Sequence, residues 1–217
     1  ECTHISPAFL VPKNSVQKRL PQGEKRSYRL IIDYRHVNTL LKFTSDRFSV
    51  YGCAELIYRI GQMRREMGEN VSSLMYSIMD IKGYFYSIPL SSKCRKYLAF
   101  RGYGTDVYEP LVLPMGISLA PGISSEILYK AIRPELRKYV IKHVDDILVV
   151  TINDPVEHER VLRMLWEDLT SLGILLSHNK VKMFRTEIEY LGVLISSDRV
   201  SILPDRVKHF QRLLLQL

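Results

Sequence analysis

The stretch "YVIKHVDDILVV", from Tyr139 to Val150, decides the fold of this chain. Apolar and β-branched residues stand on both sides of two adjacent acids, Asp145 and Asp146. Such apolar runs are typical of buried strands, so the stretch predicts a hairpin inside a sheet. Adjacent carboxylates favour water and raise each other's pKa, which makes them costly at this place. The hairpin therefore needs a chemical reason to carry them.

A divalent cation would supply that reason. Asp-Asp is a poor tight turn, for which Asn-Gly or Asp-Gly is preferred, whereas a bound metal charge stabilises both carboxylates. A third acid, Asp80, ends another apolar strand, "MYSIMD". Because no His or Cys cluster accompanies these acids, the oxygen-only ligand set favours Mg²⁺ or Mn²⁺. Two such ions close together would suit phosphoryl transfer to a hydroxyl.

The composition is ordinary for a globular protein, with 217 residues, 46% hydrophobic and 25% charged. That length allows one domain, or two small subdomains that share a sheet. The net charge of +8 favours a polyanionic partner, although a solvated basic surface accounts for it equally well. No apolar run approaches the roughly 18 residues of a membrane span, so no membrane partner is expected. The ends of the chain predict a part of a longer protein.

The three cysteines are far apart along the chain, at Cys2, Cys53 and Cys94. They form neither a disulfide framework nor a zinc-binding pattern, so a reducing compartment is expected.

Strand and helix patterns alternate along the chain. Apolar residues at helical spacing predict helices at 53–67 and 155–172, and "SLAPGISSEILYKAI" predicts a third that Pro134 ends or kinks. Alternating or β-branched runs predict strands at 28–34, 74–80, 95–100, 107–113 and 139–150, and a last hairpin follows in 187–203. A further helix is expected from 204. The hairpins indicate antiparallel pairing, hence an α+β fold with an antiparallel sheet packed on helices.

The helix after the aspartate pair has the most complete end signals. Asp154 is expected to be the N-cap, Pro155 the first helical residue, Glu157 the capping-box acid and Gly173 the stop. The predicted buried stripes are Leu162, Leu165, Trp166 and Leu169 on this helix, and Leu56, Ile57, Ile60 and Met63 on the earlier one.

Five motifs in order resemble those of reverse transcriptases. "HVDDILV" resembles their Y/F-x-D-D box, "DIKGYFYSIPL" the first-aspartate motif, "LPMGISLAP" motif B and "YLGVLIS" the primer-grip hairpin. "FLVPK" followed by "YRLIIDYRHVN" resembles the fingers of LTR retroelements. The resemblance implies the fingers and palm of a right-hand polymerase from a Gypsy-like or related pararetroviral Pol polyprotein.

The resemblance also implies a division of the chain. Residues 1–79 would be mainly fingers with the start of the palm, and 80–203 mainly palm, with a fingers hairpin at about 91–113. Residues 204–217 would begin the thumb. The rest of the thumb, the connection and the RNase H region are expected elsewhere in the same polyprotein.

The catalytic assignments follow the motifs. Asp80, Asp145 and Asp146 fall on the acids that bind two Mg²⁺ ions, with Mn²⁺ as an alternative and with Asp80 and Asp145 expected to do most of the ligation. Lys180 falls on the motif D lysine, a proton donor to pyrophosphate.

Other motif positions are assigned to the incoming nucleotide. Lys13 and Arg29 fall on the two fingers cations that hold the triphosphate, where the Arg fork suits phosphate. Backbone N–H groups from Ile81 to Tyr84 would add an anion-binding cradle. Phe85 falls on the steric gate that excludes a ribose 2′-OH; without the resemblance it is a core aromatic.

The remaining assignments concern the templating base and the primer. Met115 and Gly116 open motif B beside the nucleotide, and Leu191 and Gly192 fall on the primer grip. His143 falls on a primer contact, where the family usually has Tyr or Phe. Met115 likewise replaces the Gln of many retroviral enzymes.

These observations predict an RNA- and DNA-templated DNA polymerase that adds deoxynucleoside triphosphates to a primer 3′-OH. A cytoplasmic setting, in a virus-like particle or replication complex, is expected from the resemblance. Two alternatives stay open: a domesticated, inactive domain that binds nucleic acid, and an RNA-dependent RNA polymerase. The intact acids argue against the first, and the aromatic Phe85 argues against the second.

Overall fold

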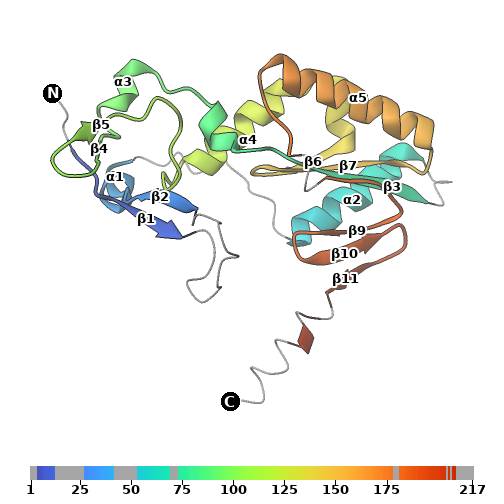
Figure 1. The fold of residues 1–217 in the computed structure, drawn as a ribbon. Helices are drawn as coiled ribbons and strands as arrows, with labels where there is room; N and C mark the ends of the chain where they lie inside the picture. Colours follow the sequence, from blue (N-terminus) through green and yellow to red (C-terminus); the bar gives the residue numbers. More distant parts are fainter. Residues whose placement is uncertain are drawn as a thin grey trace, which may run out of the picture. The chain divides into compact units, whose positions relative to one another are not determined.

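The computed structural model describes residues 4–12, 27–41, 53–68, 73–177, 181–203, 205, 207 and 208. The chain forms two compact units, the first from 1–47 and 85–124 and the second from 48–84 and 125–217 (Figure 1). The chain therefore leaves the first unit after residue 47 and re-enters it at Phe85, whereas the sequence-based division was drawn after residue 79. The names fingers, palm and thumb for these segments stay predictions.

The second unit is built around a four-stranded sheet. Its order is β6 (Val140–His143), β7 (Asp146–Ile152), β3 (Leu74–Asp80) and β8 (Lys182–Arg185), with antiparallel pairing throughout. All seven residues of β3 are buried, and all seven pair with β7. The predicted strand ending at Asp80 and the predicted aspartate hairpin are both confirmed.

Helices cover both faces of this sheet. Figure 1 shows α5 (Pro155–Ser171) on one face and α2 (Cys53–Met67) on the other. The α2 side of the core joins Leu56, Ile60 and Met63 to the alternate strand residues Leu74, Tyr76, Ile78, Leu148 and Val150. The predicted stripes are wrong at two positions, because Ile57 and Trp166 are 44% and 40% exposed. In the described parts of the chain, no helix is long and apolar enough to cross a membrane.

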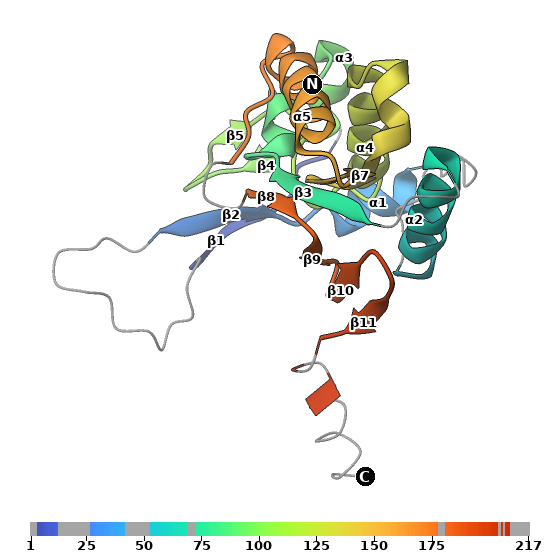
Figure 2. The same ribbon diagram turned by 90° about the vertical axis from the view of Figure 1, so that its right-hand side faces the viewer.

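A second, three-stranded sheet packs against the α2 side of the core. It contains β9 (Glu187–Tyr190), β10 (Val193–Ser196) and β11 (Val200–Ile202), so the predicted last hairpin gains a third strand. The turn between β9 and β10 has positive φ at both Leu191 and Gly192, as a tight two-residue hairpin turn requires. Figure 2 shows this sheet below β3.

The end signals of α5 are confirmed except for one. Asp154 Oδ1 accepts hydrogen bonds from the N–H groups of Val156 and Glu157, at 2.9 and 3.4 Å. Gly173, with φ of +74°, ends the helix, and the Ile174 N–H reaches back to the Leu169 carbonyl. The predicted capping box is wrong: the Glu157 side chain accepts from Arg160 and Tyr139, and the Asp154 N–H donates to the Ile152 carbonyl.

The first unit holds short elements. They are β1 (Ala8–Pro12) paired with β2 (Tyr28–Ile32), α1 (Arg35–Leu40), α3 (Ser92–Arg95), and β4 (Phe100–Arg101) paired with β5 (Val107–Tyr108). The predicted strands at 95–100 and 107–113 are therefore too long, because Ser91 caps a helical turn and the ladder holds two pairs. The boundaries between the units fall inside two further elements, η1 (Tyr84–Ser87) and α4 (Ala120–Ala131). The element η2 (Pro134–Tyr139) follows α4.

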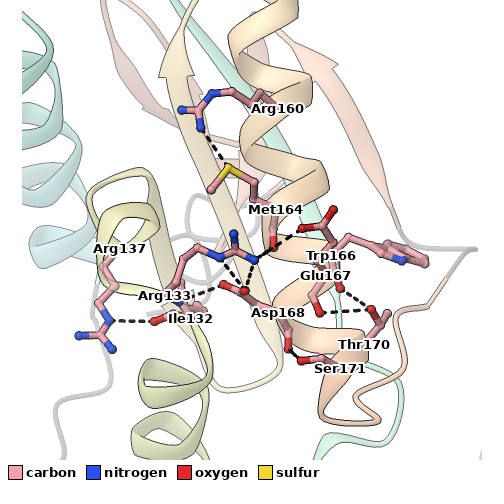
Figure 3. Close-up of polar contacts among 10 residues, drawn as sticks. All are labelled: Ile132, Arg133, Arg137, Arg160, Met164, Trp166, Glu167, Asp168, Thr170 and Ser171. Carbon is pink, nitrogen blue, oxygen red and sulfur yellow. Dashed lines mark hydrogen bonds and ion pairs between the residues drawn. The ribbon is translucent and has the colours of Figure 1, made fainter.

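An Arg–Asp pair ties the turn after α4 to α5 (Figure 3). The Arg133 backbone N–H and Nε donate to the two carboxylate oxygens of Asp168, at 2.9 and 2.7 Å. Burial by itself would raise the pKa of Asp168, but the hydrogen bonds from Arg133 outweigh it and lower the pKa. The pair fixes the segment that leads into β6 and the aspartate hairpin.

We therefore expect Asp168→Asn to lower the free energy of unfolding by about 1–3 kcal/mol, because a charged acceptor of two hydrogen bonds is lost. Urea unfolding at pH 7 measures the change. Because the folded-state pKa is lowered, the contribution is fully present above the unfolded value of about 4 and is lost as pH falls through the folded value. The matched control is Glu167→Gln, whose carboxylate lies 3.6 Å from Arg133 and is 59% exposed. Equal losses in the two variants would contradict the assignment.

Candidate active site

The aspartate hairpin has a two-residue turn, Val144 and Asp145, closed by the pair His143↔Asp146. Val144 has φ of +56°. A β-branched residue rarely adopts that conformation, and strain of this kind costs on the order of 1–3 kcal/mol. The buried ladder on either side of the turn holds it in place.

The ladder brings the three acids together at one end of the central strands. Asp80 pairs directly with Asp146, so both side chains lie on the same face of the sheet. Asp145 precedes Asp146 in the turn, and its carbonyl accepts the N–H of Ile81 at 2.9 Å. Asp80 is 6% exposed, while Asp145 and Asp146 are half-buried.

The chemistry of these donors fits a hard divalent cation, which prefers carboxylate oxygens. Over the described ranges, however, no three His, Cys, Asp or Glu side chains are arranged as a group that could hold an ion. The strand register pairs Asp80 with Asp146, whereas the sequence prediction gave Asp80 and Asp145 the larger share of ligation. That division of roles stays a prediction.

Tyr190 joins the β9–β10 turn to the start of β7, and the sequence prediction missed this contact. Its hydroxyl donates to the Asp146 carbonyl at 3.3 Å, and the residue is 3% exposed. Burial, and then the negative charges of Asp146 and Asp145, raise the pKa of Tyr190. The predicted primer residues Leu191 and Gly192 follow directly, so this contact places their turn beside the hairpin. The alternation of Ile188 and Tyr190 signals burial but not this partner.

The backbone after Asp80 corrects part of the predicted phosphate cradle. The Ile81 N–H donates to Asp145 and the Lys82 N–H to the Leu175 carbonyl at 2.8 Å, so neither is available to a ligand. The predicted cradle therefore loses these two N–H groups, and the rest of it stays a prediction. The Tyr84 side chain is a core group, 2% exposed, and burial raises its pKa.

Three other predicted residues can be placed only in part. His143 is half-buried beside the turn, and in the described structure its Nδ1 is buried without a hydrogen-bond partner. Lys13 and Lys180 lie outside the described residues, so their predicted roles have no structural account.

The remaining predicted residues lie in the first unit. Arg29 is exposed on β2 opposite Val11, and Phe85 is half-buried in η1. Met115 lines an apolar hollow of about 240 Å³ that also includes Tyr86. Within this unit, Arg29 is therefore accessible at the surface and Met115 is part of a pocket wall.

Gly116 stands at a close backbone approach that only glycine accommodates without strain. Its φ is +96°, and an added Cβ would lie 3.3 Å from the Ile32 carbonyl oxygen. The Asn38 side chain bridges this segment: its Nδ2 donates to the Gly116 carbonyl and its Oδ1 accepts the Ser118 N–H, both at 2.9 Å. Asn38 is therefore a support of the motif B segment that sequence reasoning did not identify.

A basic hollow of about 180 Å³ in the second unit was also missed. Its polar lining is Arg59, Tyr129, Arg137, Lys138 and Lys142. The Arg137 guanidinium lies 4.1 Å from the Tyr129 ring centroid, and burial lowers the pKa of Lys142. These cations come from α2, η2 and β6, so no local sequence pattern groups them.

Comparison with known proteins identifies related sequences. A family model described as "Reverse transcriptase (RNA-dependent DNA polymerase)" matches residues 11–195. An enzymatic polyprotein of Cassava vein mosaic virus is 30% identical over 205 residues, covering 93% of this chain and 28% of that protein. A Pol polyprotein from the Drosophila melanogaster transposon gypsy is 26% identical and covers 84% of this chain and 16% of that protein. The chain thus spans less than a third of these relatives.

Solved structures of similar fold include foamy viral protease-reverse transcriptases. One, in complex with dsDNA, has a TM-score of 0.72 and 20% identity over 97% of this chain and 39% of that chain. Another, in complex with an RNA/DNA hybrid, has a TM-score of 0.70 and 19% identity over 95% and 24%. The predicted α+β polymerase fold is confirmed by this likeness.

The Gly116 geometry predicts that Gly116→Ala lowers the free energy of unfolding by about 1–2 kcal/mol, because an L-residue is strained at this φ. The matched control is Gly61→Ala within α2, where the nearest atom to an added Cβ is the flexible Arg65 guanidinium at 3.7 Å. That control should instead raise stability by about 0.5–1 kcal/mol. Denaturant unfolding of both variants measures these changes in the free energy of unfolding. Stabilisation by Gly116→Ala would show the assigned conformation to be wrong.

Proposed function

Since the chain belongs to the reverse transcriptase (RNA-dependent DNA polymerase) family, we propose that it extends a primer 3′-OH with deoxynucleotides on RNA and DNA templates. The observation that carries this proposal is the register that sets Asp80 opposite Asp146, with Asp145 in the adjoining turn. The foamy viral structures in complex with an RNA/DNA hybrid and with dsDNA support both template types. The related Pol and enzymatic polyproteins support an origin in a retroelement or pararetrovirus.

Reverse transcriptases generally use divalent metal ions. In this proposal Asp80, Asp145 and Asp146 hold two Mg²⁺ ions, or Mn²⁺ in their place. When bound, such ions lower the pKa of an attacking hydroxyl and neutralise charge on the transferred phosphoryl group. The protein's share would be to hold Asp80 and Asp146 on a rigid, buried pair of strands, with Asp145 in the adjoining turn.

The primer end is proposed to lie along the turn between β9 and β10. Leu191 packs partly against the core and Tyr190 is bonded to Asp146, so the turn keeps a fixed position relative to the acids. His143, next to the hairpin turn, offers a buried ring nitrogen without a partner in the described structure. Lys180 is proposed to protonate the leaving pyrophosphate.

The nucleotide contacts are proposed from the other predicted residues. Arg29 and Lys13 would bind triphosphate oxygens, with the exposed Arg29 side chain free to form a bidentate contact. Phe85 would exclude a 2′-OH by its ring, and Met115 and Gly116 would lie beside the base pair. Deoxynucleoside triphosphates are therefore the proposed substrates.

The first test is Asp145→Asn, which keeps the shape of the side chain and removes one charge. Primer extension should fall by a factor of at least about 100, since metal-centred charge stabilisation is worth several kcal/mol and each tenfold corresponds to 1.4. Thermal stability without metal should stay equal or rise, because carboxylate repulsion is relieved. The control Asp198→Asn removes the same charge from an exposed turn and should extend primers normally. Normal extension by Asp145→Asn would refute the assignment.

The second test is Phe85→Val, measured as the ratio of kcat/KM for deoxynucleotides to that for ribonucleotides. If the ring excludes the 2′-OH, the ratio should fall by a factor of about 100 or more, since steric overlap supplies several kcal/mol of discrimination. A core role would instead lower the melting temperature and slow both substrates alike. A parental protein that prefers ribonucleotides would indicate an RNA polymerase, and one that binds template-primer without extension would indicate an inactive domain.

A further inference from the structure

A buried polar network lies behind the catalytic strands. His158 of α5, Ser77 of β3 and Thr151 of β7 are all 0% exposed. The His158 Nε2 lies 2.7 Å from Ser77 Oγ, and its Nδ1 lies 2.7 Å from Thr151 Oγ1. One imidazole thus joins the helix to both central strands of the sheet. Buried polar groups need such partners, because an unpaired one costs desolvation energy.

The outer bonds of the network determine the tautomer of His158. Thr151 Oγ1 donates to the Ile152 carbonyl at 2.8 Å, so it accepts the proton of His158 Nδ1. Ser77 Oγ accepts the Phe184 N–H at 3.0 Å and uses its own proton toward His158 Nε2. Every donor then has one acceptor, and the imidazole is neutral with its proton on Nδ1. A second proton, on Nε2, would leave the Ser77 hydroxyl proton without its acceptor.

The network also holds β8. The pairing of β3 with β8 shifts register between Tyr76 and Ile78, and Phe184 within that irregularity has φ of +53°. Its N–H donates to the Ser77 side chain, and its ring packs edge-on against His158 at 5.2 Å. The irregular strand is therefore held by the same two side chains. It begins two residues after Lys180, the predicted proton donor.

The strands in the network are the strands that carry the acids. Ser77 lies three residues before Asp80, and Thr151 lies five residues after Asp146. Odd separations place Ser77 and Thr151 on the face opposite the acids. The network thus contacts the catalytic strands from behind, where it cannot touch a substrate bound on the other face.

We propose that His158 is a positioning residue for the polymerase reaction, acting as a neutral Nδ1–H imidazole that fixes β3, β7 and β8 on α5. The proposal rests on the proposed function. Directional hydrogen bonds fix the strand positions more sharply than apolar packing does, and catalytic ligands tolerate little displacement. Of the two hydrogen bonds of His158, the one with Ser77 has the greater effect on the reaction. Ser77 contacts both His158 and β8, and it shares a strand with Asp80.

Acid should break the network. Burial lowers the pKa of His158 from 6.5 to about 4. The groups that face it from β3, β7 and β8 are Ser77, Thr151 and Phe184, and none carries a charge. Because the folded-state pKa is depressed, the stability contribution is fully present above the unfolded pKa and is lost as pH falls from 6.5 toward 4.

The first experiment examines the hydrogen bonds of the network directly and requires no measurement of enzymatic activity. Nitrogen-15 NMR of the parental chain at pH 7 should show His158 as the neutral Nδ1–H tautomer, and that signal should persist to pH 5. The Phe184 amide should exchange more slowly with solvent than in Ser77→Ala. An Nε2–H tautomer, or titration near the ordinary histidine pKa, would overturn the proposal.

The second experiment separates positioning from stability with two histidine variants. Gln at position 158 places an amide oxygen near the site of Nε2 and keeps the Ser77 bond, whereas Asn reaches only Thr151. His158→Asn and Ser77→Ala should lower kcat about tenfold and raise the Mg²⁺ concentration for half-maximal rate, with nucleotide KM little changed. His158→Gln should recover most of the activity. Failure of Gln to exceed Asn would overturn the role given to the bond with Ser77.

The matched control is Val161→Ala, which opens a cavity in the same helix, at a residue that is 0% exposed and whose apolar side chain makes no hydrogen bond of the network. At a temperature where all variants are folded, it should keep parental kcat and Mg²⁺ dependence despite a lowered melting temperature. Equal losses in Val161→Ala and Ser77→Ala would make the network merely structural. If the parental chain extends no primer, the proposed function fails. The positioning role is then decided by Mn²⁺ affinity, which Ser77→Ala should weaken and Val161→Ala should not.

Discussion

The pairing of β3 with β7 is the constraint on which the rest of this protein depends. Seven consecutive pairs fix the register, and the last of them sets Asp80 opposite Asp146. A slip of one residue would move every side chain of one strand to the other face, and the acids would no longer share a face. The apolar residues that bury both faces are therefore what hold the charged groups in register.

This arrangement concentrates unfavourable interactions at one end of the sheet. Three acidic residues lie there, Asp80 being nearly buried, and Val144 adopts a backbone conformation that β-branched residues avoid. Local strain of this kind persists only where surrounding structure over-determines it. Here the surroundings are identifiable: the Ile81 N–H bond to Asp145, the Tyr190 bond to Asp146 and the buried ladder.

The two faces of the four-stranded sheet carry different kinds of side chains. The face toward α2 and β9–β10 carries the acids and an apolar core, and the face toward α5 carries the Ser77–His158–Thr151 network. The Arg133–Asp168 pair adds a second link between α5 and the chain entering β6. Both links join α5 to segments that end at the aspartate hairpin, and α5 contains none of the predicted site residues.

The sequence by itself determined the elements whose signals are local. The bounds of α2 and β3, the aspartate hairpin and the caps of α5 at Asp154 and Gly173 follow from apolar period and residue chemistry. The order of motifs likewise identified the family and predicted the three acids as its metal-binding residues before any geometry. It misjudged Ile57 and Trp166, because periodicity locates a helix face but not its edge, and it overextended the strands at 95–113.

Only the tertiary structure decided what depends on partners distant in sequence. In the fold, the N–H groups of Ile81 and Lys82 donate to carbonyl groups of the protein, and the Tyr190 hydroxyl donates to Asp146. The Asn38 side chain likewise donates to the Gly116 carbonyl. The fold also gathers His158, Ser77 and Thr151 from a helix and two strands. The physical reason is that a hydrogen bond depends on position and direction in space, to within a fraction of an ångström, whereas a sequence pattern specifies only which face of an element is buried.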